Sequence, residues 1–301
     1  MNQSLGSGAF ILPGILADTV DEDWLNTHDE ILSEAQSTDP GMPIFATCAF
    51  SSDALRNNDQ VASFIEHAEK WGPDGYYLVF EHAEGNYLVD NPQWIANMLD
   101  ICASLRMLGK RVIVGYSNQQ TLIAAVAKVE AIASGTWMNV RSFPPEKFRS
   151  TYEDEIKQRS IWYYCPQALS EYKLSYLDIA YSLGMLETLA TPSALNGGYV
   201  DVLFRGPQPT AVGLTEQAAF RHFLHALRTQ VRSCVKPSLD ATIAHHNELL
   251  DVAQDTLQRL RSAGVFGQFR EFTECIEAHR SALSLFTAQR APTLRRKWAS
   301  L

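Results

Sequence analysis

The chain has 301 residues, of which 46% are hydrophobic, and a formal net charge of −9. This length and composition allow a full-sized core and exclude a disordered chain. Charged residues interrupt every apolar stretch before the ~20 residues that a bilayer helix needs, and no basic segment precedes an apolar run at the start, so we expect a soluble, cytoplasmic protein without a membrane partner.

Apolar or β-rich runs alternate with amphipathic helix patterns over the first 143 residues. The expected strands are 9–16, 42–50, 75–82, 111–118 and 136–143. The expected helices between them are 21–36, 51–72, 91–109 and 119–135. Capping residues Ser51 and Asn91, and glycines at 109 and 135, support these limits.

These strands are continuous apolar runs and do not alternate with polar residues, as is typical of strands covered on both faces. The pattern predicts a parallel sheet wrapped by helices, either an α/β barrel or a doubly wound sheet. We expect a TIM-type (β/α) barrel, incomplete or divergent because only about seven strands are recognisable, followed by an all-helical C-terminal region.

The second half is less regular. Two further strands are expected at 160–166 and 199–207, with a helical segment at 169–190 between them. From Leu214 the pattern is helical over 214–234, 238–264 and 269–289. We therefore predict a barrel-like domain over 1–212 and a helical region over 213–301, whose apolar stripe also suits homo- or hetero-oligomer formation.

Cysteine and histidine patterns do not predict a metal or cofactor. The five cysteines are scattered without a CxxC pair and are expected to be reduced thiols. His222 and His225 lie one helical turn apart but lack a third ligand. His245-His246 lacks a carboxylate at metal-ligand spacing, which favours either a solvated helix face or helix pairing over a metal site. No dinucleotide-binding, P-loop or metalloprotease motif occurs, so no cofactor is expected.

Polar residues gather at the predicted strand ends, where ligands bind in parallel α/β proteins. Glu81 is a candidate general base or a salt-bridge partner, and His82 a candidate acid/base or a loop residue bonded to backbone. Candidate substrate-binding residues at the other strand ends are Cys48, Ser51, Tyr116, Ser117, Asn118, Asn139 and Arg141. For several of them a structural role is an open alternative: Cys48 as a buried small hydrophobe, Ser117 and Asn118 as helix caps, Arg141 as a cover for the barrel end.

The two halves of the chain differ in charge. Residues 1–150 hold 9 Lys and Arg against 19 Asp and Glu, whereas 151–301 hold 16 against 15. An acidic surface repels nucleic acid, so any nucleic-acid contact is expected in the second half, at Arg221, Arg228 and Arg232.

The order of these segments resembles that of tRNA-guanine transglycosylases. Asp53-Ala54-Leu55-Arg56 and Asp74-Gly75 resemble the family's Asp-Leu-Arg helix and "DG" strand. The segment "KRVIVGYSNQQTLIAAVAKVEAIASGTWMNVR" is similar to its glycine-loop strand, helix and nucleophile-bearing strand. The segments "CPQALSEYKLSYLDIAYSLGML" and "AFRHFLHALRTQVR" resemble two of its later helices, and the likeness covers about residues 42–232.

The resemblance implies a (β/α)8 barrel that exchanges guanine in tRNA, or in DNA for some relatives, for a 7-deazaguanine base. In that family an Asp attacks the sugar and forms a covalent intermediate, which divides one displacement into two easier steps. The expected partner is therefore a nucleobase or a nucleic acid, and an active enzyme would be a pentosyltransferase.

The chain departs from this family at its functional positions. Ala133 or Ser134 stands where the nucleophilic Asp is expected, Val79-Phe80 replaces a glycine pair, and only Cys165 remains of the zinc ligands. Three hypotheses follow: a divergent transferase using Glu81, His82 or Ser134; a non-catalytic structural or partner subunit of the same superfamily; and an unrelated hydrolase-type or aldolase-type α/β barrel.

Overall fold

A computed structural model describes residues 6–38, 41–82, 85–136, 140–148 and 160–301. Its strands are β1 Phe10–Ile11, β2 Leu16–Ala17, β3 Ile44–Phe50, β4 Gly75–Phe80, β5 Arg111–Val114, β6 Ala131–Ile132, β7 Trp162–Cys165 and β8 Ser170–Lys173. Its α-helices are α1 Glu22–Ser37, α2 Ser52–Arg56, α3 Asn58–Ala68, α4 Pro92–Met107, α5 Leu174–Ser182, α6 Glu216–Cys234, α7 Leu239–Ser262 and α8 Thr273–Lys297. No described helix is long and apolar enough to cross a membrane.

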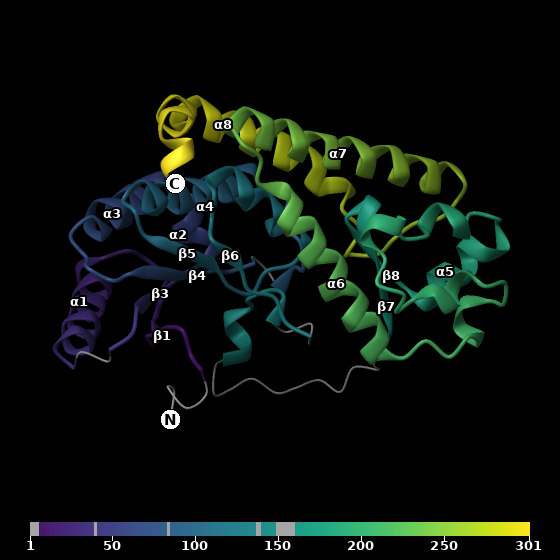
Figure 1. Cartoon of the computed structure of the whole chain (residues 1–301), viewed down its shortest axis with the longest axis horizontal. Coiled ribbons are helices and arrows are strands. Elements are labelled where there is room, and N and C mark those ends of the chain that lie inside the picture. The colour runs from purple at the N-terminus through teal and green to yellow at the C-terminus, as the bar shows by residue number, and fades with distance from the viewer. Residues whose placement is uncertain (1–5, 39–40, 83–84, 137–139, 149–159) are drawn as a thin grey trace.

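The main sheet is parallel and curled into a half-barrel, with strand order β1-β3-β4-β5-β6 (Figure 1). The two short strands β1 and β2 both pair with β3, at its start and its end, and so act as one interrupted edge strand. The predicted parallel α/β architecture with a helical C-terminal region is confirmed, whereas the described strands do not close an eight-stranded barrel.

Helices cover one face of this sheet and form the first of two cores. Alternate strand residues point into it, such as Cys48, Phe50, Leu78 and Phe80, together with apolar side chains of α1, α3 and α4. We call this part, residues 6–136 as described, the sheet lobe. The intervening strand residues point to the opposite, inner face of the curl.

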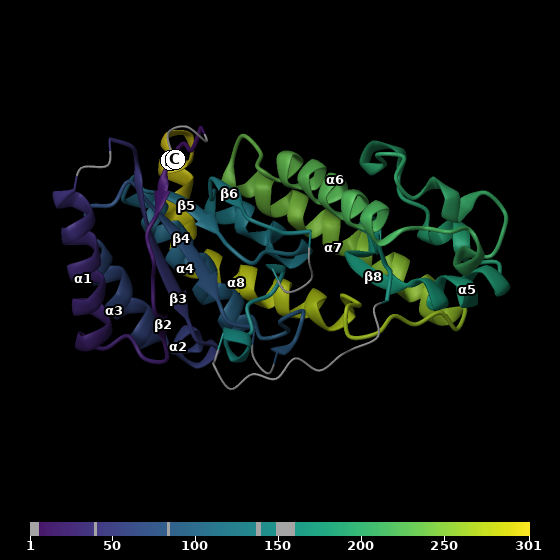
Figure 2. The same ribbon diagram turned by 90° about the horizontal axis from the view of Figure 1, so that it is seen from below.

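A second core lies around the antiparallel β7-β8 hairpin. It contains buried apolar side chains of α5 and α6, together with some of those of α7 and α8. We call the described residues 160–234 the hairpin lobe. Both α7 and α8 run from one lobe to the other (Figures 1 and 2), and α8 contributes Ile276 to the second core and Phe286 to the first. The predicted domain boundary at 212/213 stays a prediction.

Several expected elements differ in the structure. The segment expected to be a strand at 199–207 holds a 3-10 helix over Asp201–Phe204, because buried Val200 and Leu203 lie three residues apart on one side. The helix expected over 119–135 is a shorter 3-10 helix over Gln119–Ala127, and β6 follows it. The expected strand 136–143 forms only a single parallel bridge between Phe143 and Glu81 in its described part. The start of the expected helix 169–190 is instead β8.

Candidate active site on the open face of the half-barrel

The inner face of the half-barrel holds a cavity of about 520 Å³. This volume is in the usual range for small-molecule sites. Strand residues of one parity form its base, since Thr47, Ala49, Tyr77 and Val79 alternate with the residues of the first core. The remaining lining residues come from the edge strand and from loops at the carboxyl ends of the strands: Gly14, Leu16, Asp18, Tyr116, Phe143, Pro145 and Phe148.

Aromatic rings form one wall of this cavity. The ring centroids of Tyr116 and Phe143 are 5.0 Å apart, and those of Phe143 and Phe148 are 5.3 Å apart. Phe148 is 62% exposed, which is uncommon for so large an apolar side chain. Tyr116 has a left-handed backbone with φ of 50°, a conformation that costs free energy in a residue other than glycine and that recurs at functional sites.

Glu81 lies two residues beyond Val79 on the same face of β4, next to the cavity at the carboxyl ends of the strands, but it is not one of the residues that line the cavity. Its Oε2 accepts a hydrogen bond of 2.7 Å from the backbone N–H of Ser52. Burial raises the pKa of the Glu81 carboxyl above its ordinary value, and the neighbouring carboxylates of Glu146, Asp18 and Asp53 raise it further. The mouth of the cavity is therefore acidic.

A second hollow of about 180 Å³ shares Tyr77 and Tyr116 with the cavity and is also lined by Ser134. The Ser134 hydroxyl is buried and has no hydrogen-bond partner among the residues that the structure describes. The phenol oxygen of Tyr77 packs against Gly115, where an added Cβ would lie 2.4 Å from it. Burial raises the pKa of both the Tyr77 and the Tyr116 phenol, so both are neutral hydroxyl groups near pH 7.

Two of the predicted site residues lie on the helix-covered side of the sheet. Cys48 is fully buried in the first core, where burial raises the pKa of its thiol and keeps it protonated. His82 is buried against Trp94, with ring centroids 5.7 Å apart, and its Nδ1 lies 3.1 Å from the carbonyl oxygen of Tyr87. Burial lowers the pKa of His82 to about 4. Neither residue lines the cavity.

Three polar candidates hold the loops that surround the site. Ser51 caps α2 by accepting from the Ala54 N–H. The Ser117 hydroxyl donates to the Val114 carbonyl at 2.8 Å. Asn118 caps the 3-10 helix that follows it, and its Nδ2 donates to the carbonyl oxygens of Tyr87 and Arg141. Their described contacts are with protein backbone. Asn139 lies outside the described residues.

Arg141 is 1% exposed and lies at the junction of the two lobes. Its guanidinium stacks 3.5 Å from the ring centroid of Phe223, donates to the Gly135 carbonyl at 3.0 Å, and lies 3.4 Å from a Glu171 carboxylate oxygen. Arg270 reaches the same oxygen of Glu171 at 3.5 Å. Arg141 is thus bound within the protein and positions the loop that carries Ser134 and Gly135.

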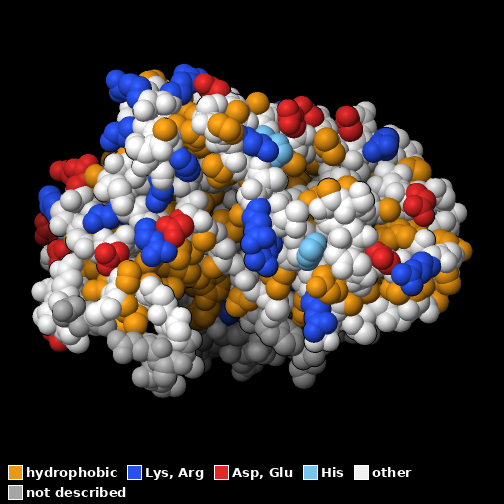
Figure 3. Space-filling model, in the orientation of Figure 1, with side chains coloured by type: hydrophobic (Ala, Val, Ile, Leu, Met, Phe, Trp, Pro, Cys, Tyr) orange, Lys and Arg blue, Asp and Glu red, His pale blue; other side chains and the backbone are white. Residues whose placement is uncertain are grey.

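The three arginines predicted to contact nucleic acid lie on the exposed side of α6. Arg228 follows Arg221 by seven residues and Arg232 follows Arg228 by four, which places the three side chains along one face of the helix. Each is exposed, and none of them forms an ion pair within the part of the chain that the structure describes. Figure 3 shows Lys and Arg side chains over the middle of the molecule, where α6 lies.

The described residues contain no cluster of three or more metal-ligating side chains. His222 is buried, with Nε2 2.8 Å from the Tyr164 carbonyl oxygen. His246 and His279 form a stacked pair between α7 and α8, with ring nitrogens 3.1 Å apart. Cys165 is buried in the hairpin lobe.

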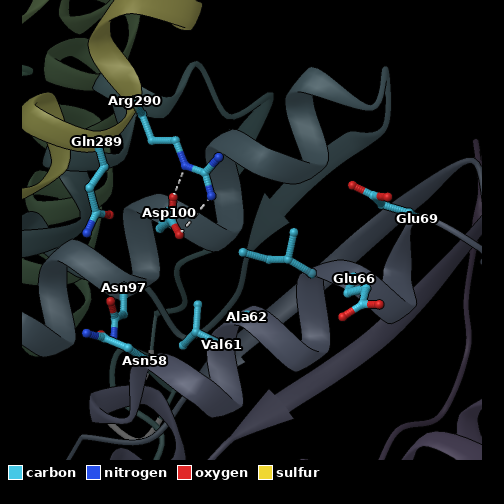
Figure 4. A pocket seen from close by; sticks show the side chains of 10 residues that line it. Asn58, Val61, Ala62, Glu66, Glu69, Asn97, Asp100, Gln289 and Arg290 are labelled. Atoms are coloured by element: carbon cyan, nitrogen blue, oxygen red, sulfur yellow. Dashed lines mark hydrogen bonds and ion pairs between the residues drawn. The ribbon is translucent and has the colours of Figure 1, made fainter.

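A separate groove of about 340 Å³ lies on the helical exterior, between α3, α4 and α8 (Figure 4). The ion pair between Asp100 and Arg290 closes one end of it, and Glu66 and Glu69 lie at the other (Figure 4). Its polar side chains bond mainly to each other, as Asn97 does with Asn58 at 3.0 Å. This groove shares no lining residue with the cavity on the inner face.

No family model, curated protein or solved structure matches the chain. From its sheet and its cavity, the molecule is an α/β half-barrel with a helical C-terminal region and an open, aromatic-lined inner face.

Several cavity residues are absent from the sequence-based candidates. Tyr77 and Val79 lie inside a strand that reads as apolar throughout, and Phe143 and Phe148 follow it by more than 60 residues. The signal in the sequence is the pair of phenylalanines on either side of Pro144 and Pro145, since an apolar loop suggests a binding role.

Proposed function

We propose that this protein binds a planar nucleobase, guanine or a 7-deazaguanine, in the cavity on the inner face of its half-barrel. The aromatic wall of Tyr116, Phe143 and Phe148 carries this proposal. Stacking of a base on an aromatic side chain contributes about 1–3 kcal/mol and requires only a flat π-face. The Glu81 carboxyl beside the cavity has one oxygen bonded to the Ser52 N–H and a second oxygen that can accept from an N–H group of guanine.

The protein is proposed to be a divergent relative of the tRNA-guanine transglycosylase-like barrels that binds the base without exchanging it. Exchange needs an activated nucleophile, and Ser134, at the nucleophile position, has no hydrogen-bonded base. His82 lies on the opposite face of the sheet and cannot carry a proton for Ser134. Glu81 is the one carboxylate in place for such chemistry among the candidates, which makes it the residue to test for base exchange.

Truncation of the aromatic wall tests base binding. Phe143→Ala is expected to weaken binding of guanine by about tenfold or more, because one stacking face is lost. Equilibrium dialysis with labelled guanine measures the dissociation constant. Tyr199→Ala, at an exposed tyrosine of the hairpin lobe, is the matched control and should bind as the wild type does. Equal affinity in Phe143→Ala and wild type would contradict the assignment of the cavity.

The exposed arginines of α6 favour a second candidate function, a nucleic-acid-binding subunit without catalysis. Arg221, Arg228 and Arg232 present three guanidiniums in a row, and each phosphate contact releases counterions from a nucleic acid. The sheet lobe has an acidic cavity mouth, so this contact would be made by the hairpin lobe alone.

The dependence of nucleic-acid affinity on salt concentration tests whether these arginines contact phosphates. Replacing the three arginines by glutamine is expected to weaken binding of a short RNA or DNA and to reduce the slope of log affinity against log salt by about 2 to 3. Fluorescence anisotropy at several salt concentrations measures both. The control is a double variant in which the exposed Arg259 and Arg296, which lie outside α6, are replaced by glutamine. An unchanged slope in the triple variant would exclude the α6 face as a nucleic-acid surface.

A further inference from the structure

We propose that the groove between α3, α4 and α8 binds a linear aliphatic polyamine, a molecule whose ammonium groups are joined by methylene chains. The groove is separate from the cavity on the inner face of the sheet, with which it shares no lining residue. Its volume of about 340 Å³ is sufficient for a small organic ligand. Its shape, its apolar floor and its unpaired carboxylates together select a linear cation (Figure 4).

The groove is long and follows one side of α3. The residues that this helix and its C-terminal end contribute recur at intervals of three and four, from Asn58 to Glu69, and so lie on one face. At the rise of an α-helix this stretch extends over about 16 Å. The opposite side is lined by α4 and α8, through Asp100 and Arg290 among others. A groove of this form accepts an extended chain better than a compact ring.

Apolar side chains form the floor in the middle of the groove. Val61 is 4% exposed, Ile65 is half-buried, and Ala62 between them is exposed and small. The methylene groups of a polyamine leave water when they lie on this floor, which favours binding. A hydrated metal ion gains nothing from apolar surface, and the described residues contain no group of three metal-ligating side chains. The floor therefore favours an organic cation over a metal ion.

The end of the groove at the C-terminus of α3 is acidic and lacks a counter-charge. Glu66 lies in the last turn of α3 and Glu69 directly after it, and both are exposed. Neither forms an ion pair with another residue that the structure describes. The helix dipole places partial negative charge at this end, so acidic side chains are unfavourable there. The histidine of the same turn, His67, contacts Asp29 of α1 instead. Two carboxylates in an unfavourable place without a cation indicate a binding role.

The charge of the whole lining also selects a cation. Among the described residues, Arg290 is the only cation that lines the groove, and it bonds to both carboxylate oxygens of Asp100. It is therefore held at the end opposite to Glu66 and Glu69 (Figure 4). Three carboxylates face one guanidinium, so an anionic ligand would meet like charge. One ammonium group lies between Glu66 and Glu69, and the methylene chain extends from there along the floor.

Equilibrium dialysis with labelled spermidine at low salt tests this site. The wild type is expected to bind spermidine, and Glu66→Gln/Glu69→Gln to bind it about tenfold more weakly, because two exposed ion pairs are lost. The matched control is Glu30→Gln/Glu34→Gln, which removes two exposed carboxylates one turn apart on α1 and should bind as the wild type does. An equal loss in the control, or no binding by the wild type, would overturn the proposal.

A variant of the floor separates a shaped site from a general attraction to negative charge. Ala62→Phe keeps every charge and is expected to weaken spermidine binding at least tenfold, because the ring takes the place of the methylene chain. Ala241→Phe, at an exposed alanine of α7, is the control and should bind as the wild type does. Unchanged affinity in Ala62→Phe would contradict the assignment of the groove. A lysine-containing peptide that binds more tightly than spermidine, and loses affinity in Ala62→Phe, would replace the small ligand by a protein partner.

Discussion

Replacing Glu171 by glutamine is expected to lower the free energy of unfolding by about 3 kcal/mol or more, because it removes the carboxylate that pairs with the buried guanidinium of Arg141. One carboxylate oxygen of Glu171 lies 3.4 Å from Arg141 and 3.5 Å from Arg270, and the Glu171 side chain is 1% exposed. Burial already lowers the pKa of Arg270, which indicates how costly its charge is in this environment.

Urea denaturation at pH 7 measures this loss. Glu187→Gln, at an exposed carboxylate of the same lobe, is the control and should change stability by less than about 0.5 kcal/mol. Replacing Glu171 and Arg141 together by methionine should cost less than Glu171→Gln alone, since the Arg141 charge is then removed together with its carboxylate. A loss below about 1 kcal/mol in Glu171→Gln would show that water reaches the lobe junction.

Mild acid is expected to unfold the protein well above the pKa of its carboxylates. Burial lowers the pKa of His82 and His222 to about 4 and that of His246 to about 3, whereas an unfolded histidine has a pKa of about 6.5. Between these values the unfolded chain binds more protons than the folded one. Stability is therefore complete above pH 6.5 and falls as the pH is lowered towards 4, by about 2 kcal/mol for each histidine at pH 5.

The free energy of unfolding as a function of pH, from denaturant titrations between pH 8 and 5, checks this expectation. His222→Asn should be less stable at pH 7, because the bond to the Tyr164 carbonyl is lost, but its stability should fall less steeply by about 1.4 kcal/mol per pH unit. Gln217→Asn, at an exposed position of the same helix, should keep the wild-type slope. A wild-type stability that is constant from pH 7 to 5 would contradict the neutral state of these rings.

Local sequence signals predict the first half of the fold well. Apolar runs, capping residues and glycines locate β3, β4, α3 and α4 to within a few residues. The errors come from long-range packing. Gly197, Gly198 and Gly206 flank a segment that reads as a strand but coils so that Val200 and Leu203 share one buried side.

The candidate site was only partly predictable for the same reason. Glu81 was identified because a carboxylate at the end of an apolar strand is conspicuous, and Tyr116 because it lies at the end of the next expected strand. Ser134 was identified only from the resemblance, as the residue at the position of the family's nucleophile. Which face of the sheet stays open is decided by where the helices pack, and the strand residues themselves look alike on both faces. The engagement of Arg141 by Phe223, about 80 residues later in the chain, carries no local signal either.

The path of α8 has a consequence for how the protein is made. This helix supplies Ala282, Leu283 and Phe286 to the core of the sheet lobe and packs along α4, although it is synthesised long after that lobe. During translation the apolar side of α4 therefore stays uncovered until α8 has left the ribosome. The nascent sheet lobe is then a natural substrate for chaperones that recognise exposed apolar helices, and its completion is delayed to the last stage of synthesis.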